Sequence, residues 1–126
     1  MRGNVIMILL ACLVVVVSVF LVVWINNGAQ ELLALCDRID EAVREGRFEE
    51  AGQHIQALNR LWARDATAWQ FVAIHDDMHQ ISDALIELSY SYQEGESQEV
   101  LLNCQLLRTA ISAVMSKELP TLENIF

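Results

Sequence analysis

The stretch VIMILLACLVVVVSVFLVVWI, Val5–Ile25, runs for 21 residues without a charged side chain. At about 1.5 Å of rise per residue, a helix of this length spans roughly 30 Å, which matches the hydrocarbon thickness of a bilayer. Valine and isoleucine form helices poorly in water, but in lipid the backbone must satisfy its own hydrogen bonds, so a helix is still expected. The sequence therefore predicts a transmembrane anchor over residues 5–25.

The charges that flank this segment predict its orientation. Arg2 and the free amino terminus stand immediately before it, whereas the first basic residue after it is Arg38. Positive charge next to a span is usually retained in the cytoplasm. Residues 1–4 are therefore expected to be cytoplasmic and residues 29–126 to lie outside the cytoplasmic membrane, as in a single-pass protein of the cell membrane.

Two processing alternatives compete with an uncleaved anchor. The apolar run begins close to the amino terminus, as in a signal peptide, but cleavage after Gly28 or Ala29 would put Asn26 or Asn27 where a small residue is required. Leu9–Cys12 has the outline of a lipoprotein box, yet cleavage there would leave an apolar amino terminus in place of a polar tether. An uncleaved anchor is favoured over both.

The part of the chain after the anchor is acidic and large enough for one small domain. All 17 acidic residues and seven of the eight basic ones lie after Asn26, so this part carries a formal charge near −10. Such a charge argues against binding to nucleic acid and to anionic lipid. With one proline, five glycines and no low-complexity run in the chain, the soluble part is predicted to be all-helical.

Apolar residues recur at spacings of three and four in four consecutive segments, which is the pattern of amphipathic helices. The segments are residues 29–45, 48 to about 64, 67–93, and a last one that begins near Ser97. The inward positions are expected to be Leu32, Leu35 or Cys36, Ile39 and Val43; Phe48, Ala51, Ile55, Leu58 and Trp62; Phe71, Ile74, Met78, Ile81, Leu85, Leu88 and Tyr92; and Val100, Cys104, Leu107, Ile111 and Val114.

Turn and cap residues separate these segments. Gly46 can adopt a left-handed conformation after the first, Asp65 is expected to cap the third and Ser97 the fourth, and Pro120 is expected to end the last helix. Short turns make consecutive helices antiparallel neighbours, which favours an intramolecular bundle over an intermolecular coiled coil. The predicted fold is all-α: an N-terminal transmembrane helix followed by a small antiparallel bundle of about four helices. Whether the anchor helix continues into the first of these stays open, because one glycine, Gly28, costs only about 1 kcal/mol.

Two histidines form the one candidate metal site. His75 and His79 stand at i and i+4 on one helix face, the spacing that metalloprotease helices use for zinc, with acidic Asp76 beside the first. The usual residue there is the longer glutamate, and no third ligand is evident. A polar edge of the bundle explains both histidines, so no cofactor is expected.

Cys36 and Cys104 are the only thiols outside the apolar segment. An exported domain could form a disulfide. Both residues, however, lie on inward helix faces whose axes pack roughly 8–10 Å apart, whereas a disulfide needs Cα atoms about 5.5 Å apart. Buried free thiols are therefore favoured, and neither cysteine sits in a motif that would activate it as a nucleophile.

The carboxyl terminus is unusually apolar for a chain end. Leu122, Ile125 and Phe126 alternate with polar residues after Pro120. We expect these three side chains either to fold back on the bundle or to offer a hydrophobic contact to a partner.

The layout as a whole resembles a known family. An apolar N-terminal anchor, an acidic helical region with Trp62 and Trp69 around a helix junction, His75 followed by acidic residues, and the terminal residues LENIF at 122–126 are together similar to a bacterial family of short membrane-anchored proteins, catalogued as domain of unknown function 4363. The resemblance covers nearly the full chain. It implies an architecture and a membrane location, but no activity, cofactor or site residue.

The functional expectation is a non-catalytic protein-interaction module outside the cytoplasmic membrane. Its partners would be the lipid bilayer, through residues 5–25, and a protein of unknown identity, but no nucleic acid. Two alternatives stay open: a metal-dependent, membrane-tethered hydrolase that uses His75 and His79, and a structural anchor that oligomerises through its span.

Overall fold

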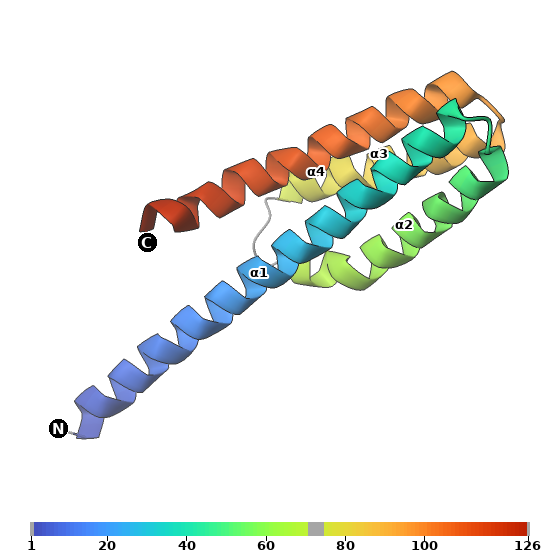
Figure 1. Ribbon diagram of the computed structural model, residues 1–126. Helices are drawn as coiled ribbons and strands as arrows, with labels where there is room; N and C mark the ends of the chain where they lie inside the picture. Colours follow the sequence, from blue (N-terminus) through green and yellow to red (C-terminus); the bar gives the residue numbers. More distant parts are fainter. Residues whose placement is uncertain (1, 71–74, 126) are drawn as a thin grey trace.

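The computed structural model describes residues 2–70 and 75–125, with side chains for residues 2–70 and 76–116. This part of the chain forms four helices: α1 Arg2–Arg44, α2 Phe48–Trp69, α3 His75–Gln93 and α4 Ser97–Ile125. α1 and α2 form one antiparallel hairpin, α3 and α4 form a second, and the two hairpins pack with both turns at the same end (Figure 1). The predicted all-α bundle of about four helices is confirmed.

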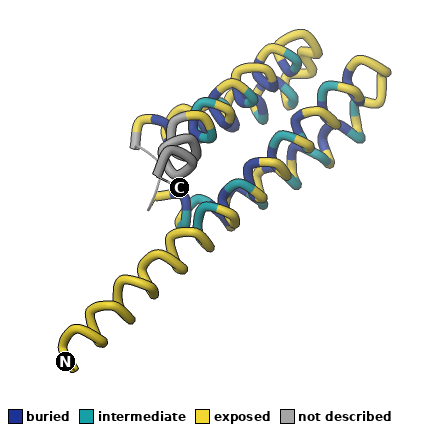
Figure 2. Tube along the Cα trace, turned by 60° about the vertical axis from the view of Figure 1, so that its left-hand side comes forward, coloured by how far each residue is buried: buried dark blue, intermediate teal, exposed yellow. Residues whose placement is uncertain are grey.

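One uninterrupted helix joins the apolar segment to the bundle. The 43 residues of α1 extend about 65 Å, and Figure 1 shows its amino-terminal half projecting beyond the other helices. The first buried residue is Ile25, followed by Gly28, Ala29 and Leu32 (Figure 2). The question left open by the sequence is thus settled in favour of continuity, since packing of this turn offsets the small helix cost of one glycine.

Both hairpin turns use the same glycine geometry. Gly46 and Gly95 have positive φ values of 78° and 74°. In the first turn the N–H of Arg47 donates to the carbonyl of Ala42 at 2.8 Å and that of Gly46 to Val43 at 3.2 Å, and the second turn repeats both bonds around Gly95. This is the Schellman arrangement, which satisfies the last carbonyls of a helix and needs a residue that tolerates the left-handed conformation. The predicted role of Gly46 is confirmed.

The two hairpins repeat each other at an offset of 49 positions. Gly46 corresponds to Gly95, and buried residues occur at matching places, such as Ile39 with Leu88 and Leu58 with Leu107. The same turn followed by the same inward stripe therefore builds each half of the bundle. The repeat is one of structure and burial pattern more than of residue identity, which is why it is hard to see in the sequence.

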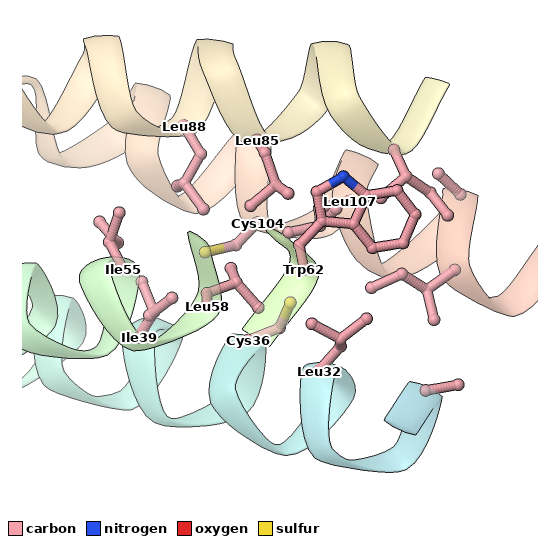
Figure 3. Packing of buried hydrophobic residues seen from close by; sticks show 14 of the residues in the cluster. Leu32, Cys36, Ile39, Ile55, Leu58, Trp62, Leu85, Leu88, Cys104 and Leu107 are labelled. Carbon is pink, nitrogen blue, oxygen red and sulfur yellow. The ribbon is translucent and has the colours of Figure 1, made fainter. Parts of the chain in front are cut away.

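The core is made of one stripe from each helix (Figure 3). Nearly all the predicted inward positions that the structure describes are buried, with Cys36 in place of Leu35, and Phe48 and Tyr92 are half-buried and stacked with ring centroids 4.6 Å apart. Phe71 and Ile74 lie outside the described residues. The largest fully buried side chains are Trp69, Leu32, Ile39, Leu58, Ile81, Leu88, Leu107 and Ile111.

Polar contacts distinguish the helix pairs inside the bundle. Asn103 of α4, which is buried, donates to the Ser91 hydroxyl of α3 at 3.1 Å and so fixes the register of the second hairpin. Between α2 and α3, which pack less closely than the other neighbours, Asn59 donates to Ser89 at 3.0 Å. The α2–α3 side is thus the least tightly packed seam of the bundle, and this hydrogen bond crosses it.

The predicted boundary between the second and third helices is wrong. Asp65 does not cap a new helix: α2 continues through it to Trp69, and α3 is described from His75 to Gln93. The reason is visible in the burial, because Trp62, Asp65 and Trp69 continue the inward stripe of α2 at steps of three and four. Tertiary packing of this last turn outweighed the local preference of aspartate for a cap.

Two expectations about α4 are also corrected. Its first residue is Ser97, so the cap position falls on Glu96, whose carbonyl accepts the N–H of Val100 at 3.0 Å. α4 also continues through Pro120 to Ile125. A proline fixes φ near −65°, which is a helical value, so its cost is a lost hydrogen bond and local crowding and not an obligatory stop.

Candidate functional site

The amino-terminal half of α1 carries a bare apolar surface. Its exposed large side chains between Val5 and Trp24 range from 39% exposed at Trp24 to 70% at Met7. Ser18, the one polar side chain among them, donates its hydroxyl proton to the Val14 carbonyl at 2.8 Å, so it adds no unsatisfied donor to the surface. α1 is long and apolar enough to cross a membrane.

A buried carboxylate lies where α1 enters the bundle. Asp65 is 2% exposed, and its oxygens accept hydrogen bonds from the neighbouring Arg64 guanidinium at 2.8 and 3.3 Å. On the other side, a Cβ added to Gly28 would lie 2.9 Å from Asp65 Oδ2 and 3.9 Å from Trp69 Nε1. Gly28 is therefore a close-packing residue of the continuous helix.

Two tryptophans complete this end of the bundle. Trp62 and Trp69 meet edge to face with ring centroids 5.2 Å apart, and the Trp62 indole N–H donates to Ser82 of α3 at 3.3 Å. Arg64 also approaches Glu31 of α1 at 3.7 Å, and its hydrogen bonds with Asp65 raise the pKa of the guanidinium. The cluster connects α1, α2 and α3 just beyond the apolar segment, and its role is packing and charge neutralisation.

Cys36 and Cys104 are buried free thiols, as expected. Both sulfur atoms lie within the packed interior (Figure 3). Burial raises the pKa of each thiol to about 12, with Arg108 opposing the rise and the nearby acidic groups adding to it. A protonated, inaccessible thiol is a poor nucleophile, so these cysteines act as small core residues.

The two histidines of the candidate metal site are only partly described. His79 lies exposed on α3, while the side chain of His75 is outside the described set. Among the described residues, no three histidine, cysteine, aspartate or glutamate side chains gather where they could hold a metal ion. The tail residues Leu122, Ile125 and Phe126 likewise have side chains outside the described set, so both assignments stay predictions.

Charge is distributed unevenly between the two hairpins. From residue 25 to 70 there are eight acidic and five basic side chains, and arginines such as Arg44 and Arg47 pair with carboxylates of the same hairpin. From residue 76 to 116 there are seven acidic side chains and one basic one, Arg108, which pairs across the bundle with Asp37 of α1. The outer surface of the second hairpin is thus left acidic.

Exposed apolar side chains are also distributed unevenly between the two hairpins. Among the described residues after Trp24, the large apolar side chains that remain exposed are Ile86, Tyr90, Leu102 and Leu106, all on α3 and α4. A shallow groove of about 330 Å³ also runs between these helices. We call the outward surface of this hairpin, with these four side chains and its carboxylates, the α3–α4 face.

Comparison with known proteins identifies the family of the chain. The sequence model of the family described as a domain of unknown function, DUF4363, matches residues 19–125. The chain belongs to this family. No curated protein and no solved structure matches it.

The family match covers the whole of the DUF4363 bundle and reaches back into the apolar segment. It therefore includes the junction at which α1 changes from exposed to buried, with Gly28 and Asp65. The resemblance inferred from the sequence is confirmed at the level of the family.

Sequence reasoning missed the buried position of Asp65 within α2 and the α3–α4 face of this DUF4363 chain. A signal for Asp65 was present, since the inward positions of α2 continue through it with an unbroken helical period to Trp69. The α3–α4 face depends on which carboxylates find arginine partners across helices, such as Asp37 with Arg108. That pairing is set by the tertiary arrangement, so it has no local sequence signal.

Proposed function

We propose that this DUF4363 chain is a non-catalytic binding module, anchored in the cytoplasmic membrane by residues 5–25 and presented outside the cytoplasm as a helical bundle. The observation that carries the proposal is the division of α1. Between Val5 and Trp24 its large apolar side chains are mostly exposed, and from Ile25 onward the inward side of the same helix is buried in the bundle. A bilayer would cover the bare part, with a gain of about 1.5–3 kcal/mol for each large apolar side chain removed from water.

The charges support the proposed orientation. Arg2 precedes the apolar segment, while the bundle that follows it holds all 17 acidic residues. Positive charge near a span favours the cytoplasmic side. An acidic bundle is also repelled by anionic headgroups, so it would stand away from the membrane surface.

The α3–α4 face supports a binding role. Its exposed apolar side chains stand beside Asp83 and Glu87, which have no ion-pair partner among the described residues. In the described part of the first hairpin, by contrast, arginines pair with carboxylates and no large apolar side chain after Trp24 is exposed. Apolar side chains among charges on one side of a small domain are typical of a protein contact.

Photo-crosslinking in native membranes tests this function. A crosslinking amino acid at Tyr90 or Leu106 should give a protein adduct, whereas the same group at Arg60, exposed on the first hairpin, should give none. Alkaline carbonate washing, which strips peripheral proteins, should leave the chain in the membrane. Release by carbonate would contradict the anchor, and a failure to form adducts from either helix of the α3–α4 face would contradict the binding role.

A further inference from the structure

The groove between α3 and α4 has a floor of small side chains. Ala84 of α3 and Ala110 and Ala113 of α4 line it, so its base is apolar and shallow. Alanine side chains keep the helix backbones accessible, which lets another helix approach closely along the groove. From Leu102 to Ala113, α4 offers about 16 Å of length, which is enough for about three turns of a helix.

The two rims of the groove differ in chemistry. Asp83 and Glu87 stand exposed one turn apart on the α3 rim, and neither side chain has an ion-pair partner among the described residues. Leu106 stands on the α4 rim, 49% exposed, and Leu102 extends the apolar line one turn further along α4 at 53%. One side of the groove is therefore acidic and the other is apolar.

We propose that this groove binds an amphipathic helix of another protein, with lysines or arginines facing Asp83 and Glu87 and apolar side chains facing Leu102 and Leu106. The proposal rests on the binding function proposed above and names the chemistry of the partner. A helix laid in a groove between two helices uses the same apolar positions at steps of three and four that build this bundle. Basic side chains on its flank would neutralise these two carboxylates, which have no ion-pair partner among the described residues.

Charge complementarity argues against a second copy of the chain as the occupant. The only large apolar side chains exposed on the described part of the bundle belong to the α3–α4 face. A second copy would therefore have to present the same acidic surface, and Asp83 and Glu87 would face like charges. Like charges across an interface weaken binding, so the partner is expected to carry the opposite charge.

A second hollow, at the turn of the first hairpin, lacks this character. It measures about 540 Å³ and is lined by Arg47, Glu49 and Glu50, among others. The Arg47 guanidinium already pairs with Glu45 and Glu50. This hollow therefore holds a paired guanidinium among its carboxylates, whereas no basic side chain of the described residues lines the groove between α3 and α4.

Peptide binding to the full chain tests the proposal. The chain is placed in nanodiscs of neutral phosphatidylcholine, and the probe is a labelled synthetic helix of about 18 residues with leucines on one face and lysines along its flank. Fluorescence anisotropy should show saturable binding that weakens about tenfold between roughly 50 and 500 mM salt. Glu87→Lys should weaken binding by about tenfold or more, because it places a like charge against the peptide.

Matched controls make the result specific. Glu49→Lys changes the net charge by the same amount on the first hairpin and should leave binding unchanged. Ala113→Phe, which fills the groove, should abolish binding while circular dichroism and the melting temperature show a folded chain. Equal binding of a peptide with the same composition but no apolar face, or equal loss with Glu49→Lys and Glu87→Lys, would overturn the proposal.

The outcomes distinguish a failure of this inference from a failure of the binding function on which it rests. Crosslinks from Tyr90 or Leu106 in native membranes, together with no binding of the basic helix, would refute the partner chemistry and leave the binding function standing. Binding of the basic helix that Glu87→Lys reduces and Glu49→Lys does not supports the inference. An absence of crosslinks from the α3–α4 face in native membranes would count against the binding function itself.

Discussion

Gly28 and Asp65 depend on each other at the entry of α1 into the bundle. The carboxylate of Asp65 fills the space that a side chain on Gly28 would need, because a Cβ there would lie 2.9 Å from Oδ2. Asp65 is short and already held by Arg64, so it has little freedom to move aside. A glycine in mid-helix is otherwise a disadvantage, and its retention here has a steric explanation.

This dependence predicts that the effect of Gly28→Ala on the free energy of unfolding changes sign when Asp65 is replaced by alanine. In the natural sequence, Gly28→Ala should lower the free energy of unfolding by about 1–2 kcal/mol, because the overlap outweighs the helix propensity that alanine adds. In an Asp65→Ala background the same substitution should raise it by about 1 kcal/mol. Denaturant titration of the four proteins in one detergent measures the cycle, and the same sign in both backgrounds would contradict the steric account.

The buried thiols predict a loss of stability at alkaline pH. In the unfolded chain Cys36 and Cys104 ionise around their ordinary pKa of 9.0, whereas burial raises the pKa of each to about 12 in the fold. Between these values the unfolded state binds fewer protons than the folded state, so the free energy of unfolding falls as pH rises. The fall is at most about 1.4 kcal/mol per pH unit for each thiol, and below pH 9 the thiols contribute no slope.

A comparison of variants isolates this effect. Cys36→Ala/Cys104→Ala should flatten the pH dependence between pH 9 and 11 and leave that between pH 6 and 8 unchanged, even though the cavities lower stability at every pH. Denaturant titrations across the range provide the slopes. Parallel curves for the two proteins above pH 9 would show that the buried thiols do not control alkaline stability.

At the scale of elements, two adjacent residues of α3 have similar side-chain volumes but opposite positions, one in the core and one in solvent. Leu85 is 3% exposed and Ile86 is 66% exposed. Leu85→Asp should destabilise the bundle by about 4 kcal/mol, because it places an unpaired carboxylate in the core. Ile86→Asp should change stability by about 0.5 kcal/mol or less. Thermal melts followed by circular dichroism compare the two, and similar melts for both variants would contradict the orientation of α3.

The inward stripes were the predictable part of the fold, whereas the helix ends were not. Positions such as Leu58 and Leu107 follow from period alone, because a small domain must bury every apolar stripe it has. Asp65, Ser97 and Pro120 were misassigned because their local preferences for caps and breaks are worth about 1–3 kcal/mol, which tertiary packing can exceed. Continuity of α1 through Gly28 was undecided for the same reason.

The candidate sites were less predictable than the fold. His75, His79 and the apolar tail stood out as residue types in a suggestive order, but a site also requires other elements to come close. The α3–α4 groove has no local motif: its alanines look like ordinary helix formers, and Asp83 and Glu87 look like an ordinary solvated face. They form one acidic and apolar surface because α3 packs on α4 and because Arg108 is the one arginine of that hairpin.

At the scale of the whole molecule, the proposed orientation predicts the behaviour of a fusion. Alkaline phosphatase, which is active only after export, should be active when joined after residue 126. Arg2→Glu combined with Asn26→Lys and Asn27→Lys reverses the charge bias across the span and should reduce that activity strongly. Phosphatase assays on intact cells, normalised to the amount of fusion protein, provide the measurement, and activity that the charge reversal leaves unaltered would contradict the orientation argument.

Because α1 is unbroken, the bundle tilts together with the apolar segment. About 20 residues of α1 follow Ile25, so the two hairpin turns stand about 30 Å beyond the point where the helix becomes buried. With no joint in between, any lean of the apolar segment in a bilayer is passed on to the bundle undiminished. A lean of about 20°, ordinary for a membrane helix, would carry the far turns about 10 Å sideways, so the thickness of the surrounding lipid would help to set where the α3–α4 face points.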